Sequence, residues 1–227
     1  MVALIQKVLG RLSARAFPHK FKRQCELSYW QRRFVEEGSC LSNSHYEPLY
    51  TAVYGLRPED YVAKRVLDIG CGPRGSLEWA DMTAQRVGLD PLVPKYLKLG
   101  ASKHKMQYVE ARSEDIPFPH GYFDIVTCLN ALDHVDNLIR TIREIKRVTK
   151  PGGFFLLSVE IDHPPRAAEP ITITEKALKG FNPEFEVVSE FKVGTPSDRN
   201  LHQAVMMRSP PYVSGHPGIF VARYLRR

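Results

Sequence analysis

A glycine-rich turn that directly follows an apolar segment constrains the fold of this chain more than any other feature. Residues 66–69 read Val-Leu-Asp-Ile, and residues 70–75 read Gly-Cys-Gly-Pro-Arg-Gly. A G-x-G-x-x-G turn after a strand brings backbone N–H groups close to a ligand, and only glycine tolerates the dihedral angles and the close approach that this requires. We therefore expect Gly70, Gly72 and Gly75 to line a cofactor site in an α/β fold.

Apolar and β-branched runs alternate with helix-sized segments along the chain. Leu92–Leu99 and Asn137–Val148 have the clearest helical patterns, and a Pro-Gly-Gly stop follows the second at 151–153. Such alternation predicts a doubly wound, Rossmann-like parallel sheet with helices on both faces. The last two strands have only a loop between them, so we expect an antiparallel hairpin at the sheet edge. The expected strands are Arg65–Ile69, Arg86–Leu89, Met106–Val109, Phe123–Leu129, Gly153–Val159, Glu186–Val193 and Ile219–Leu225.

The basic charge of the chain is confined to its first part. The net charge is +7, and residues 1–34 hold eight Lys/Arg against Glu26 alone, while the remainder carries equal numbers of basic and acidic residues. A neutral body argues against a nucleic-acid groove spread over the domain. We divide the chain into a basic N-terminal helical extension or lid, residues 1–55, and a single α/β domain, residues 56–227.

The first residues of the extension have an amphipathic, basic pattern. On a helical wheel this pattern suits peripheral contact with an anionic membrane, although a packed first helix and, in a eukaryote, an organellar transit peptide are competing interpretations. No apolar run approaches the ~20 residues needed to cross a bilayer, so we expect a cytoplasmic protein. The apolar side comprises Leu4, Ile5, Val8, Leu9, Leu12 and Ala16, flanked by Lys7, Arg11 and Arg15.

Carboxylates near the ends of successive strands distinguish between candidate cofactors. Asp68 would repel the pyrophosphate of a dinucleotide but can serve the ammonium of a methionine moiety, directly or through water. Asp90 ends the next strand, where a carboxylate can bind both ribose hydroxyls, or else cap the helix that follows. After the third strand, Glu114 or Asp115 with Ile116 offers an acceptor and an apolar wall to an adenine ring, or forms an ordinary surface turn.

Five motifs in order over residues ~60–160 resemble the class I S-adenosylmethionine-dependent methyltransferases, in particular the ubiquinone and menaquinone biosynthesis group. They are D-x-G-C-G-x-x-G, the strand ending at Asp90, S-E-D-I-P-F-P, F-D-I-V-T-C-L-N-A-L-D-H-V-D-N and R-V-T-K-P-G-G. The resemblance implies a seven-stranded sheet of order 3-2-1-4-5-7-6 with strand 7 antiparallel, and S-adenosylmethionine as cofactor. Many relatives place the third glycine one residue earlier, which puts in doubt the role of Arg74, whose guanidinium could meet the methionine carboxylate.

Candidate catalytic residues follow the fourth and fifth strands, at the edge where doubly wound sheets bind ligands. Asn130 is assigned to the cofactor, and His134 is a general base or a residue that fixes its loop by hydrogen bonds. Glu160 and His163 form a second candidate acid/base pair, or belong to a solvated loop. The acidic residues of this region do not have the spacing of the catechol-methylating metal site, so we expect no metal.

Together these features predict an enzyme that moves a methyl group from S-adenosylmethionine to a small-molecule acceptor, one that is lipid-attached or sugar-like. Aromatic residues at 29–30 and 45–46 would contact the acceptor from a lid or pack as core. Two alternatives stay open: a catalytically inactive methyltransferase-like binding domain, and an NAD-dependent oxidoreductase, which Asp68 and the terminal hairpin disfavour.

Overall fold

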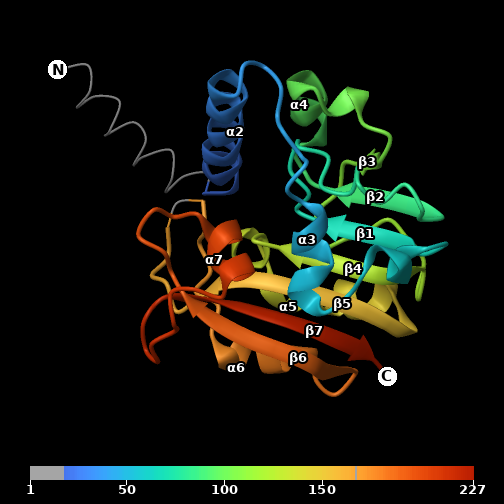
Figure 1. Cartoon of the computed structure of the whole chain (residues 1–227), viewed down its shortest axis with the longest axis vertical. Coiled ribbons are helices and arrows are strands. Elements are labelled where there is room, and N and C mark those ends of the chain that lie inside the picture. Colours follow the sequence, from blue (N-terminus) through green and yellow to red (C-terminus); the bar gives the residue numbers. More distant parts are fainter. Residues whose placement is uncertain (1–17, 167) are drawn as a thin grey trace.

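A single seven-stranded mixed sheet forms the core of the protein. The computed structural model describes residues 18–166 and 168–227. The strand order is β3-β2-β1-β4-β5-β7-β6, with β1 to β5 parallel and β7 antiparallel to both of its neighbours, as predicted (Figure 1). The strands are β1 (Arg65–Ile69), β2 (Gln85–Leu89), β3 (Gln107–Val109), β4 (Phe123–Leu129), β5 (Thr149–Ile161), β6 (Phe185–Gly194) and β7 (Gly218–Arg226).

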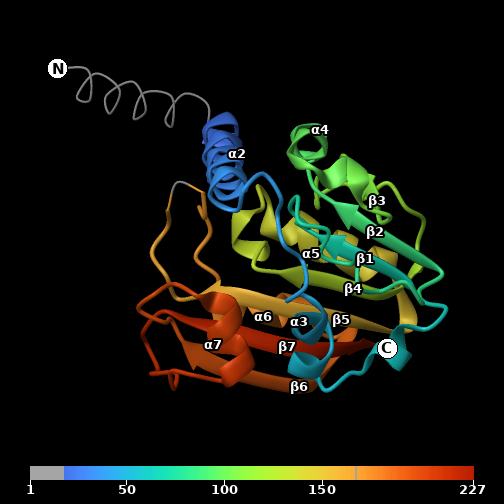
Figure 2. The same ribbon diagram turned by 45° about the horizontal axis from the view of Figure 1, so that its top comes forward.

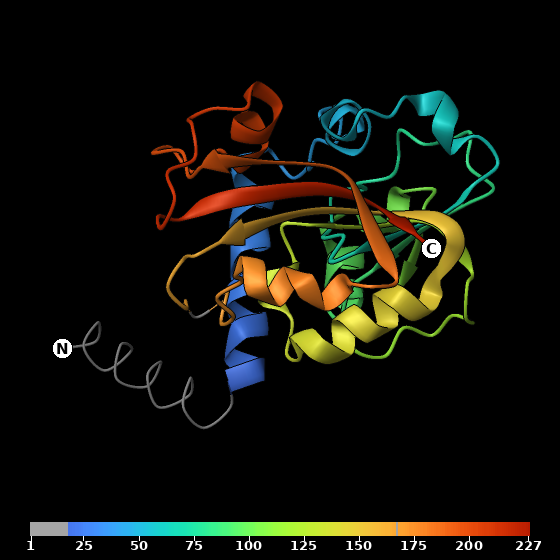
Figure 3. The ribbon, with the colours of Figure 1, turned by 90° about the horizontal axis from the view of Figure 1, so that it is seen from below.

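Helices cover both faces of this sheet (Figure 3). One face carries α5 (Leu138–Val148), α6 (Glu175–Leu178) and η6 (Lys179–Phe181), and the other carries α3 (Glu47–Tyr50), η1 (Ala52–Tyr54), η2 (Pro58–Tyr61) and α7 (Leu201–Met207). The helix α5 begins where the Asn137 side chain accepts the N–H of Arg140, and its helical spacing buries Ile142, Ile145 and Val148 against the sheet. Residues on both faces of β1 and β4 are therefore buried.

Four connections between strands differ from the expectations. Residues 70–84 and 110–122, all within the described part of the chain, form turns rather than helices. Between β6 and β7, where we expected only a loop, α7 begins at the Asn200 side chain, which accepts the N–H of Gln203. The helix expected over Leu92–Leu99 divides into α4 (Val93–Tyr96) and η3 (Leu97–Leu99), and η4 (Ala101–Lys103) follows Gly100. Short polar turns replace helices where too few apolar residues are available to bury a helical face.

The helix α2 (Pro18–Glu36) stands at the edge of the sheet where β1, β4 and β5 end (Figure 2). Trp30 and Leu27 pack there against a small cluster formed by Leu92, Tyr96 and Ala101. The predicted amphipathic segment before α2 lies outside the described residues. Across the described residues, no helix combines the length and the apolar character needed to cross a membrane. The carboxyl edge of the sheet is thus the part of the fold that α2 covers.

Candidate active site

Two adjoining cavities lie under α2 at the carboxyl edge of the sheet. The smaller, about 110 Å³, is bounded by α2 on one side and by the ends of β1, β2 and β4 on the other. The larger, about 1100 Å³, extends toward α3 and α7. Glu26, Gly70, Asn130 and His134 line both cavities. These residues mark the junction between two compartments, and the predicted Asn130 and His134 both lie there.

The glycine turn approaches its neighbours too closely for side chains. A Cβ on Gly70 would lie 2.3 Å from the Cβ of Ala131, and one on Gly72 would lie 2.9 Å from the Trp30 ring. Both glycines have positive φ angles, 72° and 59°. Gly70 lines both cavities. Gly75 lines neither cavity, so its placement does not support the predicted contact with the cofactor. The first glycine is thus the one that borders the site.

Asp68 is a buried carboxylate held by three hydroxyl groups. It accepts hydrogen bonds from Tyr50 (2.9 Å), Ser76 (2.5 Å) and Thr127 (2.6 Å), and it lines the larger cavity. Burial raises the pKa of Asp68 to about 6, although the three hydroxyl donors oppose this shift. The position suits the predicted interaction with a cationic ammonium group through the cavity.

Asp90 lies in the wall of the smaller cavity, at the end of β2. One carboxylate oxygen accepts the N–H of Leu92 at 2.8 Å, and burial raises the pKa of Asp90 to about 7. The alternative role as helix N-cap is not observed, because the N-cap position of α4 is Leu92. Asp90 therefore stabilises the turn before α4 and also lines the smaller cavity.

The turn after β3 contributes differently from the prediction. Glu114 lines the smaller cavity, but one of its oxygens accepts the N–H groups of Asp136 (2.7 Å) and Asn137 (2.8 Å), so it holds the loop that follows β4. Asp115 is exposed and Ile116 packs in the core, and neither lines a cavity. Their predicted contact with an adenine ring is not supported by this placement.

Arg74 faces the larger cavity and is held by the end of α2. Its guanidinium forms an ion pair with Glu37 and donates to the carbonyl of Ser42 at 2.8 Å. The Arg74 hydrogen bond is the main reason why the pKa of Glu37 falls to about 2. Arg74 is thus already neutralised by a carboxylate of the protein, which does not favour the predicted contact with the methionine carboxylate.

Two residues of α2 contact His134. Its Nδ1 lies 3.6 Å from Oε2 of Glu26, and its backbone carbonyl accepts a hydrogen bond from Lys22 at 2.5 Å. Lys22 also forms an ion pair with Asp136. The His134 side chain is about one quarter exposed, at 23%. Its imidazole therefore lies at the junction of the cavities beside a carboxylate that can stabilise its protonated form.

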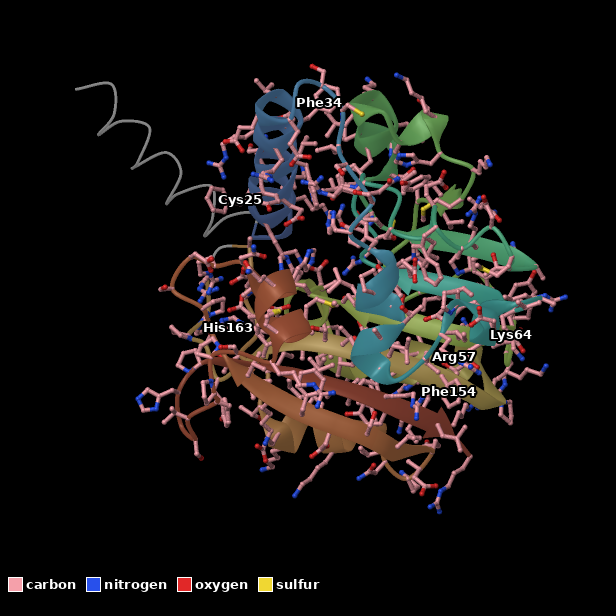
Figure 4. All side chains as sticks on the ribbon, in the orientation of Figure 1. Cys25, Phe34, Arg57, Lys64, Phe154 and His163 are labelled. Atoms are coloured by element: carbon pink, nitrogen blue, oxygen red, sulfur yellow. The ribbon has the colours of Figure 1, made fainter. Side chains whose placement is uncertain are left out.

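Glu160 and His163 do not form the predicted acid/base pair. Glu160 is buried, binds Arg199 through two contacts of 2.9 Å, and lines the larger cavity. His163 lies past the end of β5 (Figure 4), is fully buried, and lines neither cavity. The Asp133 carboxylate beside it raises the pKa of His163. Each residue therefore has its own partner, and only Glu160 borders a cavity.

Comparison with known proteins identifies the family. Residues 67–157, from β1 to β5, match the family described as a methyltransferase domain. The chain contains a class I methyltransferase domain. This match confirms the resemblance seen in the sequence motifs, and together with solved structures described as S-adenosylmethionine dependent it supports S-adenosylmethionine as the cofactor.

Curated relatives of this methyltransferase domain include ubiquinone biosynthesis O-methyltransferases. The protein of Pectobacterium carotovorum subsp. carotovorum (strain PC1) is 32% identical over 117 residues, which are 49% of each chain. The protein of Escherichia coli O7:K1 is 31% identical over 112 residues, which are 47% of each chain. The chain thus matches about half the length of these relatives.

Solved structures share the fold of the methyltransferase domain at low identity. A methyltransferase from Mesorhizobium loti, described as S-adenosylmethionine dependent, has a TM-score of 0.54 and 18% identity, and covers 74% of this chain and 92% of its own. The [4+2]-cyclase SpnF has a TM-score of 0.61 and 17% identity, and covers 92% of this chain and 96% of its own. These likenesses establish the fold.

Sequence reasoning missed the residues that other elements bring to the methyltransferase domain. Lys22, Glu26 and Trp30 are spaced by four residues on α2, and all three face the glycine turn or the loop after β4. That i, i+4 spacing was a usable signal for one face of a helix. Arg199, from the loop before α7, had no sequence signal, because its partner Glu160 lies 39 residues away.

Proposed function

We propose that this chain transfers a methyl group from S-adenosylmethionine to a hydroxyl group of a small-molecule acceptor. The observation that carries this proposal is the junction of the two cavities, where His134 and Asn130 line both compartments. Cofactor and acceptor must meet where one compartment opens into the other. His134 is the group at this junction that can accept a proton from an acceptor hydroxyl.

The residues of the smaller cavity fit the proposed cofactor. Asp90, buried at the strand end, can accept hydrogen bonds from ribose hydroxyls. In the part of the chain that the structure describes, residues 70–84 follow the glycine turn without forming a helix. The pyrophosphate of a dinucleotide would therefore lack the helix N-terminus that usually binds it. This local structure disfavours the NAD-dependent alternative. The cavity of about 110 Å³ is smaller than typical ligand sites of 300–1,000 Å³, so the cofactor would also extend into the adjoining larger cavity, which Asp68 lines.

The reaction needs little chemistry from the protein. The bound cofactor supplies a methyl group on a positively charged sulfur, which is already activated for displacement. The chain positions the acceptor and removes its proton. His134 takes the hydroxyl proton, and Glu26 at 3.6 Å stabilises the resulting imidazolium. Both residues line the cavity junction, Glu26 from α2 and His134 from the loop after β4.

Rings and polar groups in the larger cavity indicate the kind of acceptor. The rings of His45 and Tyr46 stack at 4.5 Å between centroids, and His202 lies 5.5 Å from His45. Burial lowers the pKa of His202 to about 4, so this ring is neutral near pH 7. Neutral ring faces beside the Glu160–Arg199 pair suit a hydroxylated ring. A lipid-attached or sugar-like acceptor, as expected from the sequence, belongs to this class.

Other support comes from the relatives, whose name specifies O-methyl transfer. Because the chain spans about half of their length, O-methyl transfer is a proposal for this chain. The fold alone leaves the reaction open, since the structurally similar SpnF is named as a cyclase. The acceptor therefore has to be found by experiment.

Two measurements test the proposal. Calorimetric titration with S-adenosylhomocysteine and with NAD should give binding of the first and none of the second. A screen of hydroxylated small molecules with methyl-labelled S-adenosylmethionine should then transfer label to at least one class. Binding of NAD alone would overturn the cofactor assignment. Cofactor binding with no labelled product across the screen would favour the inactive binding domain.

A further inference from the structure

We propose that Asp133, His163 and Glu169 bind one divalent metal ion of the zinc type, which joins the loop after β5 to the turn η5 (Leu132–His134). One ligand atom from each residue lies within 4.8 Å of the other two. The sequence did not predict this group, because its members come from two segments that the fold brings together. None of the three residues lines both cavities, although Oδ1 of Asp133 lies 3.9 Å from Nε2 of His134.

The ligand atoms are buried without hydrogen-bond partners. The Asp133 side chain is 1% exposed and the His163 side chain 0%. Within the described part of the chain, neither carboxylate oxygen of Asp133 nor Nε2 of His163 has a hydrogen-bond partner. Nε2 lies 3.3 Å from Oδ2 of Asp133, but not at a hydrogen-bonding angle. A buried carboxylate without hydrogen bonds is unfavourable, and a cation at this point would satisfy it.

The orientation of the His163 ring is the one that metal binding requires. Its Nδ1 lies 2.9 Å from the carbonyl oxygen of Pro164. A carbonyl oxygen can only accept, so Nδ1 carries the proton and donates. In the neutral ring Nε2 then has the lone pair, and it faces the Asp133 carboxylate. Metal-ligating histidines commonly donate their second nitrogen to a backbone carbonyl in this way, which fixes the tautomer.

The donor set and its charge match a zinc-type ion. One imidazole nitrogen and two carboxylates suit Zn²⁺, and the two negative charges would neutralise it. Zinc ligands at 2.0–2.2 Å lie roughly 3.4 Å apart in a tetrahedron, so ligand atoms that are up to 4.8 Å apart must approach by up to about 1.4 Å. Arg166 binds Oε2 of Glu169 at 2.5 Å, which leaves the other Glu169 oxygen for the ion. Glu169 also borders the larger cavity, which provides a path for the ion.

Binding at this site would affect the wall of the larger cavity. Ala168 and Glu169 both line that cavity, and they belong to the loop that the ion would hold against η5. The ion would therefore have a structural role, because it would fix the loop that forms part of the wall of the larger cavity. One ligand, Asp133, also lies beside the proposed base, with its Oδ1 3.9 Å from Nε2 of His134.

The test uses the full-length chain after treatment with a chelator and removal of the chelator. Titration with ZnCl₂ should show one ion bound per chain and a higher melting temperature. Glu169→Gln keeps the shape of this half-buried side chain and removes its charge. It should weaken zinc binding more than about 10-fold, because even the loss of a group that only supports a metal ligand lowers metal affinity 10- to 100-fold. Asp162→Asn is the matched control in the same loop, and it should bind zinc like the wild type.

Cobalt provides a second measurement that keeps the proposal testable if His163→Gln fails to fold. Co²⁺ bound to wild-type protein should give visible d–d absorption without a thiolate charge-transfer band, which excludes the four cysteines as ligands. Absence of zinc binding by the wild type, or equal binding by Glu169→Gln and wild type, would overturn the proposal and leave a buried imidazolium at His163. Neither measurement depends on methyl transfer, so the proposed function can fail or succeed separately.

Discussion

Oε2 of Glu26 lies 3.6 Å from Nδ1 of His134, so a residue of the N-terminal helix completes the environment of the histidine that follows β4. Lys22, one turn earlier on α2, donates to the His134 carbonyl. The pair brings α2 to the junction of the two cavities.

The first prediction concerns His134 as the general base. His134→Ala should lower turnover by about 100-fold or more, because proton removal contributes at least this much, while the affinity for S-adenosylhomocysteine stays nearly unchanged. Initial rates with an identified acceptor and calorimetry measure the two effects. His216→Ala, at an exposed histidine, is the control. Near wild-type activity in His134→Ala, or a loss of thermal stability equal to the loss of activity, would make the residue structural.

Asp90→Ala should weaken binding of S-adenosylhomocysteine without unfolding the domain. Charge-assisted hydrogen bonds of about 1.5–3 kcal/mol would be lost, which corresponds to roughly 10- to 100-fold in affinity. Calorimetry on the folded variant, checked by circular dichroism, gives the answer. An unchanged dissociation constant would remove Asp90 from the binding site.

The contribution of Asp90 to the stability of the ligand-free protein should fall as the pH rises from about 4 to above 7. Burial raises the pKa of Asp90 to about 7 from 3.8, so the folded chain holds this proton more tightly than the unfolded chain. The stability that results is present below pH 4 and is lost as the pH passes the folded value. Denaturant unfolding between pH 4 and 8 measures this decline. Asp90→Asn, which cannot ionise, should flatten the curve; an equally steep decline would assign the effect to other groups, such as Asp68.

Gly70→Ala should cost more stability than the same change at a glycine with open space. Gly70 and Gly55 have similar positive φ angles, 72° and 66°, but only at Gly70 would a Cβ meet another atom, the Ala131 Cβ at 2.3 Å. The shared backbone strain is about 1–2 kcal/mol. Denaturant unfolding and titration of both variants should show a larger loss for Gly70→Ala, with weaker cofactor binding. Equal losses would show that the turn is free to move away from β4.

The basic N-terminal segment should bind an anionic membrane surface. The full chain should sediment with anionic liposomes at low salt and should be released as salt rises, because screening acts over about 10 Å at 0.1 M. Deleting residues 1–17 leaves the described helix α2 with its Lys22 and Glu26 contacts, so cofactor binding should persist while sedimentation is lost. Equal sedimentation of both proteins would place membrane contact elsewhere. Failure of the shortened protein to fold would show that the segment packs on the domain.

The order of the strands was implied by the resemblance to the methyltransferase family. The position of each strand was predictable from the sequence itself, because each strand is a local apolar run. The glycine turn and the carboxylate of Asp90 were predictable for the same reason, since each follows a strand directly. Among the connections between strands, residues 70–84 and 110–122 form no helix, because they lack an apolar helical face.

Only the tertiary structure decided which partners the polar side chains have. Arg74 had a plausible ligand in the sequence, but the fold places Glu37 beside it. His163 was paired with Glu160 from their proximity along the chain, yet each has another partner after folding, Asp133 and Arg199. Helical and strand periods are local properties of a sequence. A buried charge is instead satisfied by whichever group the packing of distant segments brings within a few ångströms, and no local pattern contains that information.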